Sequence, residues 1–348
     1  VEVSGTVFQV SEKYKVEKAV GHGSYGVVVS AEDTTTGKKV AIKKVPNLFC
    51  DLDCATRVLR EIKVVNNLRH DNVLAAIDLE PPVRGKLVDA YIVTELMETD
   101  MHRVIYSRQR LSDEHIQYFM YQTVCALKFM HSAKVIHRDI KPSNILLNAD
   151  CKLRLCDFGF ARSNLDKDST MTEYVVTRWY RAPEIMLASQ RYTSAVDIWS
   201  LGCVFAELLG SRPLFPGEDY VDQLRLITSA LGTPSEDDMT FITSDLARNF
   251  MKKQSHKPGV TFRTLFPDAN ALALDLLEKM LCFHPDKRIT AAEALSHPYI
   301  AGFRGTGDER EADTVFTFNF EEEDLTHATL KAHYLEEIAK FHPEVVRR

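Results

Sequence analysis

The sequence predicts an α+β chain of two lobes, a small lobe rich in β-strands followed by a larger, mainly α-helical lobe. Up to about residue 97, short β-rich runs such as 39–44 and 90–94 are broken by turn residues. From Leu111 onward, apolar residues recur at helical spacing. They are Ile116, Met120, Val124, Leu127 and Met130. We therefore expect the boundary between the lobes near residue 98.

The composition is that of an ordinary globular protein. Of the 348 residues, 45% are hydrophobic and 26% are charged, and the formal net charge is −6. Nothing in this balance favours nucleic acid or an anionic membrane as a partner. No apolar run approaches the roughly 18 residues of a membrane-spanning helix, and no signal peptide opens the chain. The seven cysteines show no C-x-x-C pair, so we expect reduced thiols in the cytoplasm or nucleus.

Three motifs follow one another in the middle of the chain. H-R-D-I-K-P-S-N covers 137–144, D-F-G covers 157–159 and A-P-E covers 182–184. In this order and at these separations they resemble the signature set of the eukaryotic protein kinases. The resemblance implies the two-lobed kinase fold and an enzyme that uses ATP and Mg²⁺.

A glycine pattern, G-H-G-S-Y-G, covers 21–26. A dinucleotide-binding site needs a helix directly after such glycines, but the β-branched run 27–29 follows here. The pattern therefore favours a hairpin whose backbone amides lie over the phosphates of ATP. In the V-A-I-K strand that follows, strand alternation places Ala41 and Lys43 on one face, and Lys43 is predicted to bind phosphate.

A helix is expected over about 54–68, where Val58, Ile62 and Val65 are spaced to pack one face. Glu61 projects from an adjacent face, from which it can reach Lys43. The functional hypothesis is that this pair holds Lys43 on the α- and β-phosphates. The position of the helix would then control the activity of the enzyme.

The residues after the 90–94 strand fit a connector between the lobes, whose backbone at Glu95 and Met97 is expected to pair with the adenine edge. Thr94 is expected at the mouth of a pocket behind the adenine, and its small side chain leaves that pocket open. The whole expected ATP-binding set is Gly21, His22, Gly23, Ser24, Tyr25, Gly26, Val28, Ala41, Lys43, Glu61, Thr94, Glu95, Met97 and Leu146.

Phosphoryl transfer requires positioning and charge neutralisation more than covalent chemistry. Asp139 is the expected acceptor of the hydroxyl proton, and Lys141 is expected to steady the transferred phosphate. Lys43, on the α- and β-phosphates, completes the expected catalytic set. Asn144 and Asp157 are the expected Mg²⁺ ligands, since oxygen donors suit a hard cation.

The segment M-T-E-Y-V-V-T-R-W-Y-R-A-P-E over 171–184 narrows the resemblance to the mitogen-activated protein (MAP) kinases of the extracellular-signal-regulated type. Thr172 and Tyr174 match the two activating phosphorylation sites of that family. The resemblance implies dual phosphorylation by an upstream dual-specificity kinase and transfer to Ser or Thr followed by Pro, with 176–181 forming the proline pocket. The matching phosphate-pairing arginines are Arg57, Arg60, Arg138, Arg162, Arg178 and Arg181.

Two further motif residues are expected to be structural. Asp197 in D-I-W-S-L-G is expected to brace the catalytic loop, and Arg288 is expected to pair with Glu184. Residues 213–270 hold P-L-F-P-G and L-G-T-P, which match the insert region that MAP and cyclin-dependent kinases share.

The tail resembles the MAP-kinase extension that folds back onto the small lobe. Phe316, Phe318 and Phe320 alternate there as expected apolar anchors. Asp308 and Glu309 match part of the acidic patch that holds basic docking peptides, whereas Gly305 stands where the family usually has another acid. The expected organisation is an arm over 1–13, a kinase domain over 14–300 and an extension over 301–348.

Three other functions compete with this interpretation of the sequence. A pseudokinase scaffold is disfavoured because Lys43, Asp139 and Asp157 are all present. A cyclin-dependent kinase is disfavoured by T-E-Y and by the long tail. A nucleotide-binding regulator without transfer activity is excluded only by measured phosphorylation. The resemblance further implies phosphatases and protein substrates as partners, a monomer, and a cytoplasmic and nuclear location.

Overall fold

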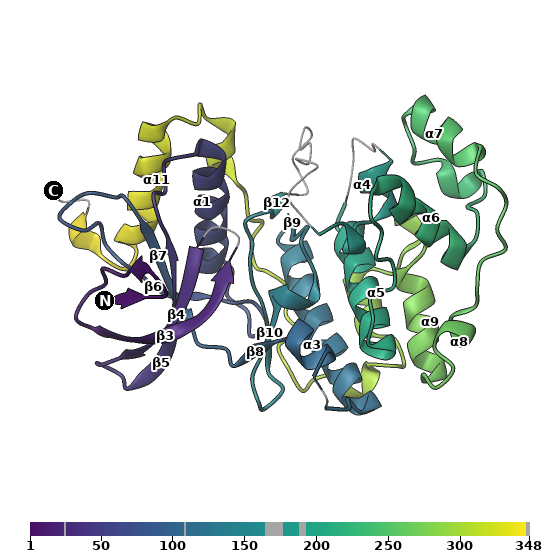
Figure 1. Cartoon of the computed structure of the whole chain (residues 1–348), viewed down its shortest axis with the longest axis horizontal. Helices are drawn as coiled ribbons and strands as arrows, with labels where there is room; N and C mark the ends of the chain where they lie inside the picture. Colours follow the sequence, from purple (N-terminus) through teal and green to yellow (C-terminus); the bar gives the residue numbers. More distant parts are fainter. Residues whose placement is uncertain (24–25, 108, 164–176, 188–192, 346–348) are drawn as a thin grey trace. The chain divides into compact units, whose positions relative to one another are not determined.

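The computed structural model describes residues 1–23, 26–107, 109–163, 177–187 and 193–345. The chain forms two compact units (Figure 1). Unit 1 comprises Val1–Glu98, Cys156–Phe160 and Phe318–Arg348, and unit 2 comprises Thr99–Leu155 and Ala161–Thr317.

Unit 1 carries most of the strands. Its strands are β1 (Glu2–Val3), β2 (Thr6–Val7), β3 (Tyr14–Gly23), β4 (Gly26–Asp33), β5 (Lys38–Val45), β6 (Ala76–Leu79) and β7 (Ala90–Glu95). Its helices are α1 (Leu52–Asn67), α11 (His327–Ala339) and the 3₁₀ turns η6 (Asn319–Glu322) and η7 (Pro343–Val345).

Unit 2 is mainly helical. Its α-helices are α2 (Met101–Ile105), α3 (Asp113–Ser132), α4 (Pro183–Met186), α5 (Ala195–Gly210), α6 (Tyr220–Leu231), α7 (Asp245–Lys252), α8 (Phe262–Leu265), α9 (Ala271–Met280) and α10 (Ala291–Leu295). Its short strands are β8 (Thr99–Asp100), β9 (Val135–Ile136), β10 (Ile145–Leu147), β11 (Leu153–Leu155) and β12 (Arg162–Ser163). Its 3₁₀ turns are η1 (Pro142–Asn144), η2 (Arg178–Tyr180), η3 (Asp237–Met239), η4 (Pro285–Lys287) and η5 (Ala301–Phe303). This division into a strand-rich and a helix-rich part confirms the predicted fold class.

The sheet of unit 1 has the antiparallel order β3-β4-β5-β7-β6. Its register pairs Val28 with Lys43 and Ala41 with Thr94. Because side chains alternate along a strand, these four residues lie on one face of the sheet. The other face carries the buried core residues Val29, Ala31, Val40, Ile42, Tyr91 and Val93. The turn after β4 contains Gly37 at φ +69°, the left-handed conformation that glycine adopts without strain.

The first thirteen residues are anchored to the core of unit 1 through Phe8. The hairpin β1–β2 leads to Phe8, which is 1% exposed and packs with Tyr14 in the sheet core. The backbone N–H of Gln9 donates to the hydroxyl of Tyr91 at 3.1 Å, and the carboxylate of Glu80 accepts from Ser11. The expected arm is therefore an integral part of the folded unit.

The helix expected over 54–68 begins two residues earlier, at Leu52, because the side chain of Asp51 caps it by accepting from the amides of Asp53 and Cys54. Helix α11 lies alongside it, drawn in yellow beside α1 in Figure 1. The hydroxyl of the fully buried Tyr334 donates to the carbonyl of Ala55 at 2.7 Å. Lys63 and Glu337 form an ion pair at 3.1 Å.

Of the three alternating phenylalanines in the tail, two anchor in unit 1. Phe318 is 4% exposed and Phe320 is 2% exposed. Phe316 belongs to unit 2 instead, where its backbone N–H donates to the carbonyl of Ala133. The expectation of three anchors is wrong for Phe316, because the chain passes from one unit to the other between 317 and 318.

In unit 2, the buried helix α5 contacts α3 and α9. Trp199 and Phe205 of α5 are fully buried. Helix α3 begins directly after its N-cap Ser112, which forms a capping box with His115. The strands β11-β10-β8 form a small antiparallel sheet beside α3.

We expect Phe320→Ala to lower the free energy of unfolding by about 3–5 kcal/mol, because the substitution leaves a cavity where the tail packs in unit 1. Urea unfolding measures this change. The matched control is Leu246→Ala, since Leu246 is 82% exposed and its loss is expected to cost less than about 0.5 kcal/mol. Equal effects of the two variants would show that the extension does not stabilise the unit.

Candidate active site

The first component of the site is the ion pair between β5 and α1. The Nζ of Lys43 lies 2.8 Å from both carboxylate oxygens of Glu61. Glu61 is 8% exposed, and the side chain of Lys43 is 17% exposed. The pair that the spacing of V-A-I-K and the helix predicted is therefore formed.

The electrostatics of Lys43 follow from its neighbours in unit 1. Burial by itself lowers the pKa of a lysine, but the carboxylates of Glu61 and Asp157 outweigh burial and raise the pKa of Lys43 above its ordinary value. Lys43 is therefore a permanent cation at neutral pH, as a phosphate-binding lysine must be.

Asp157 stands in unit 1, directly after strand β11 of unit 2. Its φ is +63°, in the left-handed region that side-chain-bearing residues seldom adopt. Such backbone strain tends to concentrate at functional sites.

The catalytic loop of unit 2 lies between β9 and η1. Asp139 is 3% exposed, and its Oδ2 accepts from Lys141 Nζ and from Asn144 Nδ2, each at 2.9 Å. Asn144 Nδ2 also donates to the carbonyl of Asp139 at 2.8 Å. Three of the predicted catalytic and metal-binding residues are thus held by one another. Leu146 follows on β10 and is partly buried.

Asp197 braces this loop from α5, as its motif predicted. Its Oδ1 accepts the N–H of Arg138 at 2.8 Å, and its Oδ2 accepts the N–H of His137 at 2.9 Å. His131 Nε2 lies 2.9 Å from the same Oδ2. Burial raises the pKa of a carboxyl group, but these contacts outweigh burial and lower the pKa of Asp197. Arg138 is held at φ +69° by this arrangement.

A second buried contact joins the A-P-E motif to Arg288, directly after η4. Arg288 pairs in a fork with both oxygens of Glu184, at 2.5 and 2.7 Å. Both side chains are almost fully buried. The predicted structural pair is confirmed.

Four of the six predicted phosphate-pairing arginines lie in unit 2. The guanidinium of Arg178 lies 5.2 Å from the ring centre of Tyr220, that of Arg181 lies 5.6 Å from it, and Arg181 also donates to the Tyr220 hydroxyl. Arg138 and Arg181 line a cavity of about 10 Å³ that also contacts Asp139 and Thr177. Arg162 donates to the carbonyl of Ala161 at 3.0 Å.

The other two arginines lie on α1. Arg60 is 2% exposed, and it donates to the carbonyl of Gly159 at 2.6 Å and to Glu321 at 2.7 Å. The guanidinium of Arg57 lies 5.1 Å from the ring centre of Phe160. Sequence reasoning missed Glu321, which occupies one of the expected phosphate ligands, and His131, which supports Asp197. Neither residue is marked by a motif or by a spacing signal.

Some predicted residues lie outside the described part of the chain. They are Ser24 and Tyr25 of the glycine hairpin, Thr172 and Tyr174 of the activation segment, and the first residue of the expected proline pocket, Val176. The described glycine-hairpin residues, Gly21, His22, Gly23 and Gly26, end β3 and begin β4. Apart from its chain neighbours, the described residues place no heavy atom within 4 Å of a Cβ added at Gly21, which leaves room for a ligand beside this backbone.

The segment 94–97 is the one expected to contact adenine. It begins with Thr94, which is 9% exposed, and includes Glu95 and Met97. The hydroxyl of Thr94 donates to the carbonyl of Glu95 at 3.2 Å. Among the described residues, no group of three or more His, Cys, Asp or Glu side chains is arranged to hold a metal ion. In the same part of the chain, no helix has the length and apolar character needed to span a membrane.

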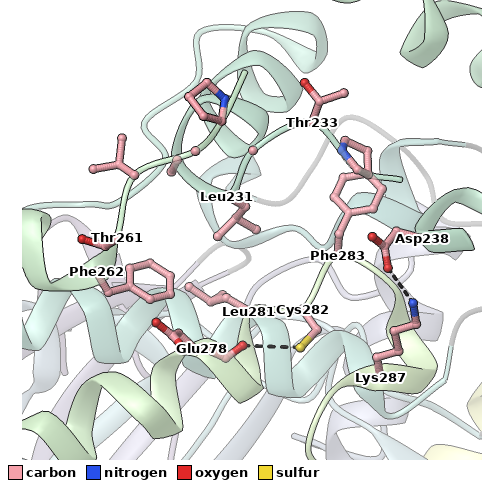
Figure 2. Close-up of a pocket in the computed structure, with 16 residues that line it drawn as sticks. Leu231, Thr233, Asp238, Thr261, Phe262, Glu278, Leu281, Cys282, Phe283 and Lys287 are labelled. Atoms are coloured by element: carbon pink, nitrogen blue, oxygen red, sulfur yellow. Dashed lines mark hydrogen bonds and ion pairs between the residues drawn. The ribbon is translucent and has the colours of Figure 1, made fainter. Parts of the chain in front are cut away.

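A separate hollow of about 450 Å³ lies in unit 2, away from the predicted site residues (Figure 2). Segments 230–234 and 258–262 line one side of it, and the end of α9 lines the other. Asp238 and Lys287 close one edge with an ion pair at 2.7 Å.

The glycine hairpin, the Lys43–Glu61 pair and the Asp139 loop define the class of protein kinases, and the chain matches the family model of the protein kinase domain over residues 14–300. It is 48% identical over 344 residues, 98% of its length, to extracellular signal-regulated kinase 1 of Dictyostelium discoideum, of which it spans 65%. It is also 48% identical over 344 residues to mitogen-activated protein kinase 4 of Arabidopsis thaliana and 49% identical over 331 residues to mitogen-activated protein kinase 13 of the same plant, and it spans 91% of each.

The chain therefore belongs to the MAP kinases of the extracellular-signal-regulated type. It is a proline-directed serine/threonine protein kinase, and its family acts in MAP kinase cascades. Protein kinases generally use ATP and Mg²⁺.

We expect Asp197→Asn to lower the free energy of unfolding at pH 7 by about 3 kcal/mol. The side-chain nitrogen of asparagine cannot accept a hydrogen bond, so one of the buried backbone N–H groups of His137 and Arg138 loses its partner. The folded-state pKa of Asp197 is lowered, so its stabilising contribution is present above pH about 4 and is lost as the pH falls through the folded-state value. The difference between wild type and variant should thus stay constant from pH 6 to about pH 4 and shrink as the pH falls further, toward pH 3.

Thermal unfolding across that pH range measures the effect. Asp268→Asn, at an exposed position, is the control and should leave stability nearly unchanged. A pH-independent difference between wild type and Asp197→Asn would contradict the assignment of a charged Asp197.

Proposed function

We propose that the chain transfers the γ-phosphate of ATP to Ser or Thr in Ser/Thr-Pro sites, with Asp139 accepting the proton of the attacking hydroxyl. The observation that supports this role best is the pair of 2.9 Å contacts that hold Asp139 Oδ2. Lys141 neutralises charge beside it and is suited to steady the transferred phosphate. Lys43, positioned by Glu61, is assigned to the α- and β-phosphates.

The donor chemistry of the chain fits ATP and Mg²⁺. The open backbone at Gly21 suits a phosphate cradle, and Val28, Ala41 and Thr94 share a sheet face with Lys43 that suits an adenine ring. Mg²⁺ commonly takes one or two protein oxygens and completes its shell with phosphates and water. Asn144 and Asp157 supply oxygens of that kind, while Glu95, Met97 and Leu146 are assigned to adenine.

We further propose activation by phosphorylation of Thr172 and Tyr174. Each phosphate adds about −1.5 to −2 charge and requires arginine partners. Arg178 and Arg181, grouped at Tyr220, supply one such pair. Arg57, Arg60, Arg138 and Arg162 are assigned to phosphothreonine, and Arg60 would have to share its guanidinium with Glu321.

The proposed partners are an upstream dual-specificity MAP kinase kinase, phosphatases, Ser/Thr-Pro substrates and docking peptides held near Asp308 and Glu309. We propose a monomer that acts in the cytoplasm and nucleus. The seven cysteines, all within the described residues, form no disulfide, which is compatible with a reducing compartment.

We expect Asp139→Ala to lower kcat about 10²–10⁴-fold while the Kd for ATP changes less than about threefold, because Asp139 acts on the hydroxyl and not on the nucleotide. Single-turnover phosphorylation and nucleotide titration measure the two effects. Asp150→Ala, at an exposed position, should change neither value. An equal loss of nucleotide binding and phosphoryl transfer would contradict the proposed role of Asp139 as proton acceptor.

We expect Thr172→Ala combined with Tyr174→Phe to abolish activation by an upstream dual-specificity kinase without lowering the melting temperature. The assay compares a Ser-Pro peptide with its Ser-Ala analogue before and after treatment with that kinase. Wild type should gain activity by orders of magnitude and should prefer the Ser-Pro peptide. Equal activity of treated wild type and variant would contradict activation through Thr172 and Tyr174. A large fall in melting temperature would mean that these two side chains stabilise the fold by packing.

A further inference from the structure

The surface around η5 combines three carboxylates and three cations that pair with one another in unit 2. We call it the η5 surface. Its charged residues are Lys128, Arg304, Asp308, Glu309, Arg310 and Glu311, so their formal charges cancel. The partly exposed rings of Tyr118 and Phe303 contact each other beside these charges, with their centres 5.1 Å apart.

Glu309 is occupied at both of its oxygens. Its Oε1 accepts from the Tyr121 hydroxyl at 2.9 Å and from the Gly305 N–H at 2.6 Å, and its Oε2 accepts from Arg304 at 2.9 Å. These contacts outweigh partial burial and lower the pKa of Glu309. Gly305 can direct its N–H to this carboxylate because it adopts φ +77°, a conformation that glycine takes without strain. Glu309 therefore fastens the 304–309 turn to α3.

Asp308 is paired as well. The Nε of Arg310 lies 3.2 Å from its Oδ2, and the guanidinium of Arg310 lies 5.7 Å from the ring centre of Phe129. The Asp308 side chain is only 15% exposed. Lys128 contributes a third cation, 3.5 Å from Glu311 and 2.7 Å from the backbone carbonyl of Glu309.

We propose that the chain masks its own docking acids, so that the η5 surface takes partner peptides of low net charge rather than strongly basic ones. This inference rests on the proposed docking role of Asp308 and Glu309. A basic peptide has to displace Arg304 and Arg310 from carboxylates that they already satisfy, so its arginines gain little over neutral side chains. The aromatic pair Tyr118–Phe303 then supplies the attractive contact, because apolar burial does not compete with these ion pairs.

The test uses two fluorescein-labelled dodecapeptides that differ only in charge. One carries two leucines and two arginines, and the other has glutamine in place of each arginine. On the wild-type chain we expect the two Kd values to agree within about threefold, with little change between about 50 and about 300 mM NaCl. On Arg304→Gln with Arg310→Gln we expect the arginine peptide to bind about fivefold to tenfold more tightly than its analogue, with a clear salt dependence.

The matched control removes two paired surface cations elsewhere in unit 2, by Lys152→Gln with Lys252→Gln. It should leave the ratio of the two Kd values as in wild type, and Tyr118→Ala should weaken both peptides. A wild-type preference of about tenfold for the arginine peptide would overturn the proposal. So would a wild-type chain that binds neither peptide, an unchanged ratio in the arginine variant, or an equal change in the control.

Two measurements distinguish a failure of this docking proposal from unfolding of a variant and from a failure of the proposed catalytic roles. The melting temperature of each variant shows that it is folded. Phosphorylation of a short Ser-Pro peptide without a docking sequence tests the proposed catalytic roles independently. A chain that phosphorylates this peptide yet prefers the arginine docking peptide would contradict only the masking of the η5 surface.

Discussion

The Lys43–Glu61 ion pair is the interaction on which unit 1 depends for function. It joins the central strand β5 to α1, and its two 2.8 Å contacts require the helix to stand at one position along the sheet. A buried pair of this kind contributes little net stability, because desolvation offsets most of the attraction. Its value lies in geometry, since it keeps a cationic ammonium at one place on the sheet face that also carries Val28, Ala41 and Thr94.

The extension after residue 317 supplies the second support of the same helix. Tyr334 contacts the first turns of α1, Glu321 contacts its middle through Arg60, and Glu337 contacts Lys63 and Asn66 near its end. At the far edge of the sheet, His342 lies 2.8 Å from Asp78. Helix α1, which carries Glu61, is thus held from the sheet side by the Lys43 ion pair and from the tail side by several contacts.

Short-range patterns predicted the parts of the site that depend on local geometry. Strand alternation placed Ala41 and Lys43 on one face, helical spacing brought Glu61 toward Lys43, and the motif context of Asp197 indicated its bracing role. Contacts such as Arg60–Glu321 and His342–Asp78, 261 and 264 residues apart in the chain, have no local signature, because only tertiary packing decides which acid meets which base. For the same reason the expectation that Phe316 anchors in unit 1 is wrong, because it belongs to unit 2. The residues at 172 and 174 stay predictions, because they lie outside the described part of the chain.

The arginines show why composition alone is a poor guide to an electrostatic switch. Six matched a family pattern, yet in the structure each already has partners of a different kind. Arg178 and Arg181 share the ring of Tyr220, and each also donates a hydrogen bond, Arg178 to the carbonyl of Glu218 and Arg181 to the Tyr220 hydroxyl. Arg60 is committed to a carboxylate and a carbonyl, so a phosphate must compete with existing partners. The same rule governs the η5 surface, where Arg304 and Arg310 neutralise the acids beside them. In both places the partner already present determines how strongly a new charge is bound.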